Sequence, residues 1–126
     1  MHMGKFVIKE AKGGVKFNLK AGNGEVIASS EIYTTLGACK NGIESVRRNS
    51  AEAAIEDQTV EGFEKIKNPK FEIYKDKAGE FRFRLKAVNG QTIATGEGYK
   101  DKKACKNGIE SVKKNAASAD VVQEAE

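Results

Sequence analysis

Hydrophobic and polar residues alternate at two places in the chain. Residues 15–21 and 81–87 each place an apolar side chain at every second position, with Lys, Asn or Arg between. A period of two predicts a β-strand that has one buried face and one face in water. Asn23-Gly24 and Asn89-Gly90 follow, and such a pair favours a tight hairpin because both central residues of that turn need a positive φ. We therefore predict an antiparallel strand after each pair.

After each predicted hairpin, the spacing of apolar residues changes from that of a strand to that of a helix. Apolar residues recur at spacings of three and four within residues 36–46 and 105–112, which is typical of an amphipathic helix. Thr35 and Asp101 stand where each helix would begin, and both residue types cap helices by accepting a backbone hydrogen bond. An earlier strand and a short closing strand complete each unit as β-β-β-α-β. We place these strands at Phe6, Phe71, 53–55 and 121–122.

The two stretches are copies of one unit. The segment from Cys39 to Val46 recurs without change from Cys105 to Val112. We interpret residues 1–126 as a single domain of two repeats, which share a core because a unit this small buries little apolar surface alone. The boundaries are repeat 1 at residues 4–58, a linker at 59–70 and repeat 2 at 71–123.

The hairpin, the tyrosine before each helix and the helix sequence together resemble a known family. Tyr33 and Tyr99 precede helices that read Asn-Gly-Ile-Glu-Ser-Val, two basic residues and Asn. In these features residues 4–123 are similar to the YegP-like family of small bacterial and archaeal proteins. The resemblance implies an α+β fold in which two tandem βββαβ repeats form one antiparallel sheet, with helices on one face and exchanged C-terminal strands. It implies no assigned reaction, and Cys39 and Cys105 depart from the family pattern.

Composition excludes several classes of protein. Hydrophobic residues make up 39% and charged residues 32%, with 22 Lys and Arg against 18 Asp and Glu. No stretch approaches the ~20 apolar residues of a membrane span. We expect a cytoplasmic bacterial protein, a monomer of two pseudo-symmetric repeats, with no cofactor and no metal. The one histidine, His2, precedes the repeats, and we interpret Cys39 and Cys105 as buried, reduced and inert.

Basic residues on the alternating strands are the strongest candidates for binding. Their side chains point away from the core, so that on a shared sheet they line one open face, where a tyrosine joins them as a stacking platform. The candidate nucleic-acid residues are Lys16, Lys20, Tyr74, Arg82, Arg84 and Lys86. Guanidinium groups beside an aromatic ring on an exposed sheet are typical of single-stranded nucleic-acid binders. The alternative is that these charges only solvate the polar face and discourage edge-to-edge aggregation.

Glycines and carboxylates at matching positions of the repeats raise further possibilities. Gly42 and Gly108 lie inside the predicted helices, where glycine costs about 1 kcal/mol, so either tight packing or a ligand against bare backbone explains them. Glu31 and Glu97 fall on the core side of their strands. There they would act as an acid and a base, unless a strand bulge turns them outward or they hydrogen-bond Tyr33 or Tyr99.

Two lysines have no structural explanation in the sequence. Lys102 and Lys103 put positive charge at a predicted helix start, where it opposes the helix dipole unless an anion lies nearby. Taken together, these patterns predict a non-enzymatic binding or structural module whose partner, a nucleic acid or a protein, is unknown. Nucleic acid at the basic sheet face is the first alternative, and an enzyme that uses Glu31 and Glu97 is the least favoured.

Overall fold

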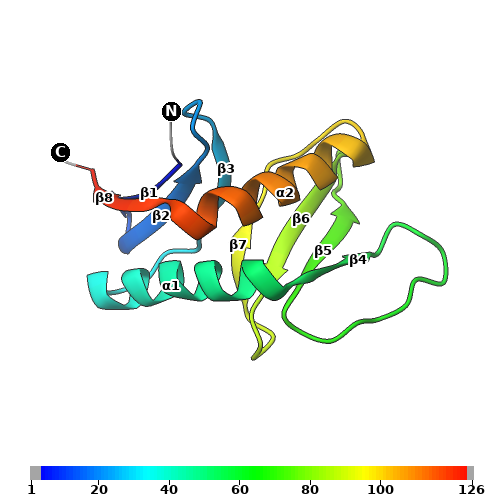
Figure 1. Ribbon diagram of the computed structural model, residues 1–126, viewed down its shortest axis with the longest axis horizontal. Coiled ribbons are helices and arrows are strands. Elements are labelled where there is room, and N and C mark those ends of the chain that lie inside the picture. Colours follow the sequence, from blue (N-terminus) through cyan, green and yellow to red (C-terminus); the bar gives the residue numbers. More distant parts are fainter. Residues whose placement is uncertain (1–3, 125–126) are drawn as a thin grey trace.

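The chain forms eight strands and two helices in a computed structural model that describes residues 4–124 (Figure 1). The first repeat gives β1 (Lys5–Ala11), β2 (Gly14–Lys20), β3 (Val26–Ser29), α1 (Leu36–Glu52) and β4 (Ala54–Asp57). The second repeat gives β5 (Lys70–Lys75), β6 (Phe81–Lys86), β7 (Thr92–Thr95), α2 (Lys102–Ser118) and β8 (Asp120–Gln123). Each unit has the predicted order, and the side chains of Thr35 and Asp101 accept the backbone N–H groups that cap the helices.

The strands form one sheet in the order β4-β5-β6-β7-β3-β2-β1-β8. The closing strand of each unit lies beside the first strand of the other, since β4 pairs with β5 and β8 pairs with β1. The exchange of C-terminal strands is therefore confirmed. Both exchanged pairs are parallel, so the expectation of an antiparallel sheet is wrong at the two edges and the sheet is mixed. Neither pair is joined by a hairpin, which would require antiparallel strands, so the connections permit the parallel pairing.

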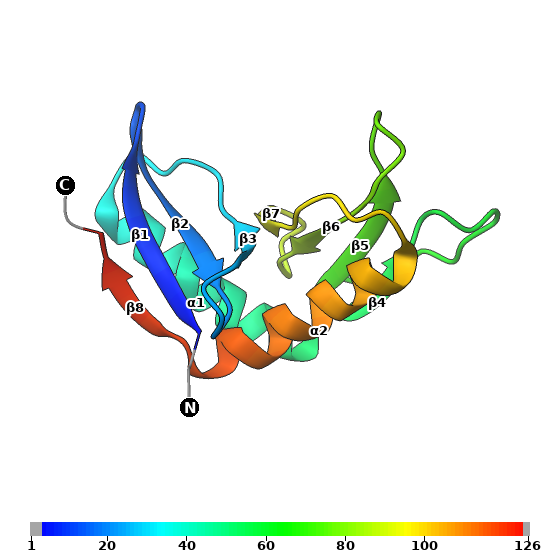
Figure 2. The ribbon, with the colours of Figure 1, turned by 90° about the horizontal axis from the view of Figure 1, so that it is seen from above.

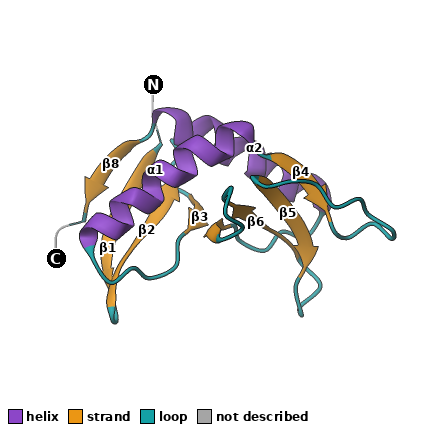
Figure 3. Cartoon of the chain, turned by 90° about the horizontal axis from the view of Figure 1, so that it is seen from below, coloured by secondary structure: helices purple, strands orange, loops and turns teal. Residues whose placement is uncertain are grey.

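The sheet has two halves with one shared interior. The first half contains β3, β2, β1 and β8, the second contains β7, β6, β5 and β4, and Ser29 pairs with Thr95 where they meet. Both helices cover the same face of the sheet (Figures 2 and 3). One buried cluster includes Phe6 and Phe17 of the first repeat together with Phe71 of the second. Neither α1 nor α2 carries an apolar stretch long enough to cross a membrane.

The helix glycines lie where a tyrosine ring crosses the helix backbone. A Cβ atom at Gly42 would collide with the ring and hydroxyl of Tyr33, and one at Gly108 would collide with those of Tyr99. The ring of Tyr33 also stacks on the core residue Phe17, with 6.2 Å between the ring centroids. Tight packing therefore explains both glycines, and the protein itself occupies the space that the other interpretation gave to a ligand.

The segment between β4 and β5 forms a loop of residues 58–69, which extends beyond β4 at one end of the molecule (Figure 1). Most of the loop is exposed, including Val60 and Phe63. Its returning arm touches the body of the protein, because the Ile66 N–H donates a hydrogen bond of 2.8 Å to Glu56 Oε1. The loop thus covers part of the sheet face that lies opposite the helices.

Candidate nucleic-acid interface

Four lysines lie together on the outer face of the first half, the face opposite the helices. They alternate along β1 and β2 with the core residues Phe6, Ile8, Phe17 and Leu19. In the pairing of these strands Lys5 is opposite Lys20 and Lys9 is opposite Lys16. Within residues 4–124 none of the four ammonium groups lies within ion-pair distance of a carboxylate. We call Lys5, Lys9, Lys16 and Lys20 the lysine face.

The equivalent surface of the second half is neutralised by acidic residues. Lys70, which corresponds to Lys5, places its ammonium 2.8 Å from Glu56 and 3.3 Å from Glu72. Arg84 pairs with the other oxygen of Glu72. The side chains of Glu56, Lys70 and Glu72 are almost fully buried, and every buried polar side-chain atom in the described part of the chain has a hydrogen-bond partner. We call Glu56, Lys70, Glu72 and Arg84 the buried ion network.

The structure therefore divides the six candidate residues into two groups. Lys16 and Lys20 belong to the open lysine face. Arg82 lies 3.5 Å from Asp76 and donates to the carbonyl of Gly96, and the Arg84 guanidinium lies over the ring of Tyr74, 4.3 Å from its centroid. Lys86 is half-buried opposite Lys70. Sequence alternation gave the correct face for all six residues and for Glu72, which engages Arg84, but it missed Lys5, Lys9 and the pairing of Arg82 with Asp76.

The carboxyl of Glu56 has an unusual pKa. Burial alone would raise it, but hydrogen bonds from Lys70, Gln58 and the Ile66 N–H, together with the charge of Lys70, outweigh burial and lower the pKa of Glu56 from 4.5 to about 2. The pKa of Glu72 is also lowered, because the hydrogen bonds and charges of Arg84 and Lys70 overcome its burial. The network therefore stays ionised well into the acid range.

This pKa predicts a pH dependence of stability. A carboxyl whose pKa is lower in the folded state stabilises the protein above its unfolded value, and that contribution is lost as pH falls towards the folded value. For Glu56, a change from 4.5 to about 2 corresponds to about 3 kcal/mol. We expect the free energy of unfolding, measured with urea, to fall between pH 5 and pH 2, and the Glu56→Gln variant to be less stable than the wild type at pH 7 but equal to it near pH 2. If the free energies of unfolding of the wild type and Glu56→Gln changed with pH in the same way, the low pKa would not belong to Glu56.

One of the two unexplained lysines now has a partner. Lys102, the first residue of α2, lies 2.8 Å from Asp57 at the end of the exchanged strand β4. The anion that the dipole argument required is thus a side chain of the other repeat, and the pair ties β4 to α2. Lys103 is exposed, and nothing in the structure explains it.

The residues considered for catalysis are not arranged for it. Glu31 and Glu97 are both exposed rather than turned into the core. Glu31 lines a hollow of about 230 Å³ where β3 meets β7, but its neighbours there are hydroxyl residues and an alanine, with no second acid or base. Cys39 and Cys105 are buried free thiols, as expected. Burial raises the pKa of both, and with the nearby charge of Asp57 it raises that of Cys105 to about 11, so these thiols are poor nucleophiles.

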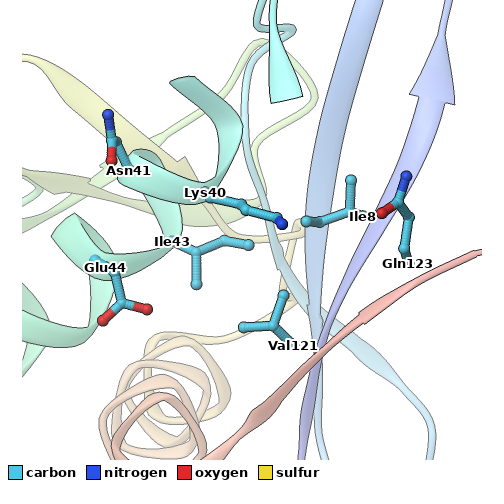
Figure 4. A pocket seen from close by; sticks show the side chains of 7 residues that line it. All are labelled: Ile8, Lys40, Asn41, Ile43, Glu44, Val121 and Gln123. Carbon is cyan, nitrogen blue, oxygen red and sulfur yellow. The ribbon is translucent and has the colours of Figure 1, made fainter. Parts of the chain in front are cut away.

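Two hollows flank the exchanged strand β8. On the helix side, a cavity of about 360 Å³ lies between α1 and β8, with Ile8, Ile43 and Val121 as its apolar lining (Figure 4). On the outer face, a cavity of about 340 Å³ is lined by Val7 and Val122 and by members of the lysine face. Sequence reasoning missed both, because each depends on β8 lying beside β1, far away in the sequence.

Comparisons with known proteins agree with this architecture. A family model described as a domain of unknown function, DUF1508, matches residues 10–57 and again residues 76–123. The UPF0339 protein YegP of Yersinia pestis is 44% identical over 119 residues, which are 94% of this chain and 93% of that protein. A UPF0339 protein of Treponema denticola is 65% identical over 54 residues, 43% of this chain but 93% of the relative, so it corresponds to one repeat.

A solved structure has the same fold. The solution NMR structure of yegP from E. coli, itself described as a protein of unknown function, superimposes with a TM-score of 0.78 at 33% identity and covers 98% of this chain and 95% of that chain. Neither that description nor the description of the family assigns a reaction. With a family model on both repeats and relatives along nearly its whole length, the chain belongs to the DUF1508 family of domains of unknown function and is a relative of the UPF0339 protein YegP.

Proposed function

We propose that the protein is a non-enzymatic binding module whose lysine face holds the phosphate backbone of single-stranded nucleic acid. The observation that carries this proposal is the set of four lysines on two neighbouring strands, none of which forms an ion pair in the described part of the chain, although Asp120 lies beside Lys5 in the register of β8 with β1. Like charges directly opposite each other destabilise a sheet. The two lysine pairs therefore weaken the fold slightly, and a bound polyanion relieves their repulsion.

The dimensions of the lysine face suit a chain of phosphates. Opposite side chains on paired strands lie roughly 5 Å apart, and the four-residue step from Lys5 to Lys9 spans roughly 13 Å along β1. Lysine contacts to phosphate carry no base information, so binding is expected to be independent of sequence. The second half contributes little, because its acids already occupy Arg82 and Arg84.

The affinity of this surface for nucleic acid should depend steeply on salt. For single strands, log K falls with log salt at a slope of about −0.7 per neutralised phosphate. Four contacts predict a slope of about −3 and a loss of affinity of about fifty-fold between 50 and 200 mM salt. The Lys9→Gln/Lys16→Gln variant should bind roughly tenfold or more weakly at 50 mM salt, with a slope closer to −1.4. Fluorescence anisotropy of a labelled single-stranded oligonucleotide measures both quantities.

The matched control for this experiment removes the same charge elsewhere. Lys103 and Lys106 are exposed on α2, on the opposite side of the molecule. The Lys103→Gln/Lys106→Gln variant should lose much less affinity than Lys9→Gln/Lys16→Gln. Equal losses in the two variants would show attraction by net charge alone, and binding that ignores salt would rule out the proposed interface.

A further inference from the structure

The cavity on the outer face of the sheet lies at one end of the lysine face. We call this cavity, of about 340 Å³, the outer cavity. Lys5 and Lys20 line it together with Val7 of β1 and Val122 of β8, and the hairpin of residues 21–24 forms its remaining wall. The volume is at the lower end of the range for small-molecule pockets, which are mostly apolar and have a few polar groups at fixed positions.

The walls of the outer cavity are held in place by the fold. Val7 is almost fully buried and lies in the sheet between β2 and β8. The hairpin is closed by two backbone hydrogen bonds of 2.9 Å, in which the Ala21 N–H donates to the Glu25 carbonyl and the Gly24 N–H donates to the Ala21 carbonyl. A ligand that enters the cavity therefore meets fixed walls, and little conformational entropy is lost on binding.

The charged groups among the described residues that line the outer cavity are both positive. Lys5 and Lys20 are opposite each other on β1 and β2, and neither forms an ion pair within residues 4–124. Asp120 lies beside Lys5 in the register of β8 with β1 but does not line the cavity, so the two lysines outnumber the one acid next to them. A ligand that suits these walls has an anionic group for the lysines and an apolar body for the valines.

The second half of the sheet fills the equivalent position with its own side chains. Glu72 and Glu56 of the buried ion network stand where the outer cavity has Val7 and Val122. Both carboxylates contact the ammonium group of Lys70. The first half keeps the lysine but has an apolar residue at each of the two acidic positions. The anion that the protein provides in the second half must therefore come from a ligand in the first half.

The lysines beyond the cavity show that this ligand has several anionic groups. Lys9 and Lys16 are opposite each other further along the same two strands. They continue the positive charge away from the cavity, where a small molecule with one anionic group would not reach them. A single strand of nucleic acid has both features, because its phosphates follow one another along the backbone and each nucleotide also has a flat base.

We infer that the outer cavity binds one unstacked base of the single strand, which lies against Val7 and Val122 while Lys5 and Lys20 hold the phosphates on either side of it. The inference rests on the proposed function, since both lysines belong to the lysine face. Among the described residues that line the cavity, only the lysines have polar side chains, so the cavity accepts any base. A base in a duplex must first leave its stack, and the cavity therefore favours single strands.

The test compares two fluorescein-labelled probes on the full-length protein. One is an oligothymidylate, and the other is an abasic strand of the same length, which keeps the phosphates but has no bases. We expect the abasic strand to bind roughly tenfold more weakly, in the lower part of the range for one base contact. The affinities of both strands should fall with salt at the same slope, because the phosphate contacts are the same.

The two probes separate this inference from the proposed function. Equal affinities with a steep salt dependence would overturn the inference and leave the proposed function in place, since phosphate contacts alone explain such binding. Failure of both strands to bind, or binding that ignores salt, would overturn the proposed function and the inference with it.

A pair of variants places the effect at the outer cavity. Val122→Glu puts a carboxylate where the second half has Glu56, so that it meets Lys5 inside the cavity. We expect the preference for oligothymidylate over the abasic strand to fall from roughly tenfold to less than about twofold. The matched Val121→Glu adds the same charge to the same strand but on the helix side, and it should keep the preference. An equal preference in the two variants would overturn the inference, and thermal unfolding checks that both fold.

A further measurement needs no variant. In NMR spectra of the complex with oligothymidylate, nuclear Overhauser effects should connect thymine protons with the methyl groups of Val7 and Val122. The methyl groups of Val121, on the helix side, should show none. Effects at Val121 instead, or no effects at Val7 and Val122, would overturn the inference.

Discussion

Replacing Lys70 by Met is expected to lower the free energy of unfolding by about 3–5 kcal/mol, because removal of one partner leaves a buried charge uncompensated. Glu56 has almost no solvent exposure, and Lys70 supplies its only cationic partner in the described structure. The carboxylate would keep its hydrogen bonds from Gln58 and the Ile66 N–H but lose the charge that balances it. Urea unfolding at pH 7 measures the difference.

The molecule provides a matched control for this prediction. Lys5 holds the equivalent position in the first repeat but is exposed and has no carboxylate partner within residues 4–124. Lys5→Met should change the free energy of unfolding by less than about 0.5 kcal/mol. The Lys70→Met/Glu56→Met double variant should recover much of the lost stability, since apolar replacement of a whole buried pair is often neutral. A single Lys70 variant as stable as the Lys5 variant would refute the role given to the network.

The buried ion network also makes the two halves unequal. In the first half, the positions of Glu56 and Glu72 are held by Val122 and Val7, which pair directly in the sheet. If β4 paired with β1 of its own repeat, Glu56 would lie beside Val7, with Lys5 at the position of Lys70 but without Glu72 and Arg84. The complete network, in which Glu72 and Arg84 also take part, therefore forms only when β4 pairs with β5.

Replacing Gly42 by Leu should lower stability by about 3 kcal/mol or more, at the upper end of the range for overpacked positions. Any Cβ at this position meets the hydroxyl and ring of Tyr33, and that ring is held against Phe17 in the core. The better helix propensity of leucine recovers at most about 1 kcal/mol. Chemical denaturation followed by circular dichroism gives the change in the free energy of unfolding.

Gly37 is the control on the same helix, because a Cβ there would meet nothing within 4 Å. Gly37→Leu should leave stability unchanged or raise it by up to about 1 kcal/mol. Tyr33→Leu should partly rescue Gly42→Ala, since it removes the hydroxyl and ring that the new methyl group strikes. If Gly42→Leu unfolds like the wild type, packing does not explain the glycine.

Repeat comparison came close to revealing the acidic network. Glu56 corresponds to Val122 in the other repeat, and Glu72 corresponds to Val7. The sequence thus has an acidic residue at two positions that are apolar in the other repeat. Alternation also placed Glu72 on the polar face. The sequence did not show that β4 crosses to β5, and without that pairing Glu56 has no reason to meet Lys70.

Glu31 and the lysine face show a second limit of pattern reasoning. Alternation alone puts Glu31 on the core side, and a bulge was the alternative that turns it outward; in the structure β3 ends at Ser29, its register with β2 shifts between Leu19 and Lys20, and Glu31 is exposed. Beyond such an irregularity the two-residue period no longer identifies a face. Along β1 and β2 the pairing is regular, and there the alternation gave the correct orientation of Lys16 and Lys20.

The sequence by itself determined the repeat, the βββαβ order, the residues that cap the helix N-termini and the face on which each residue of a regular strand lies, because these depend on contacts between neighbours in the chain. Only the tertiary structure decided the parallel edges, the pairing of Lys102 with Asp57, the neutral second half and the open edge at β8. Each of these arises where one repeat supplies a strand to the other. Local periodicity contains no information about which distant strand completes a sheet, since that choice depends on burial and charge pairing across the whole molecule.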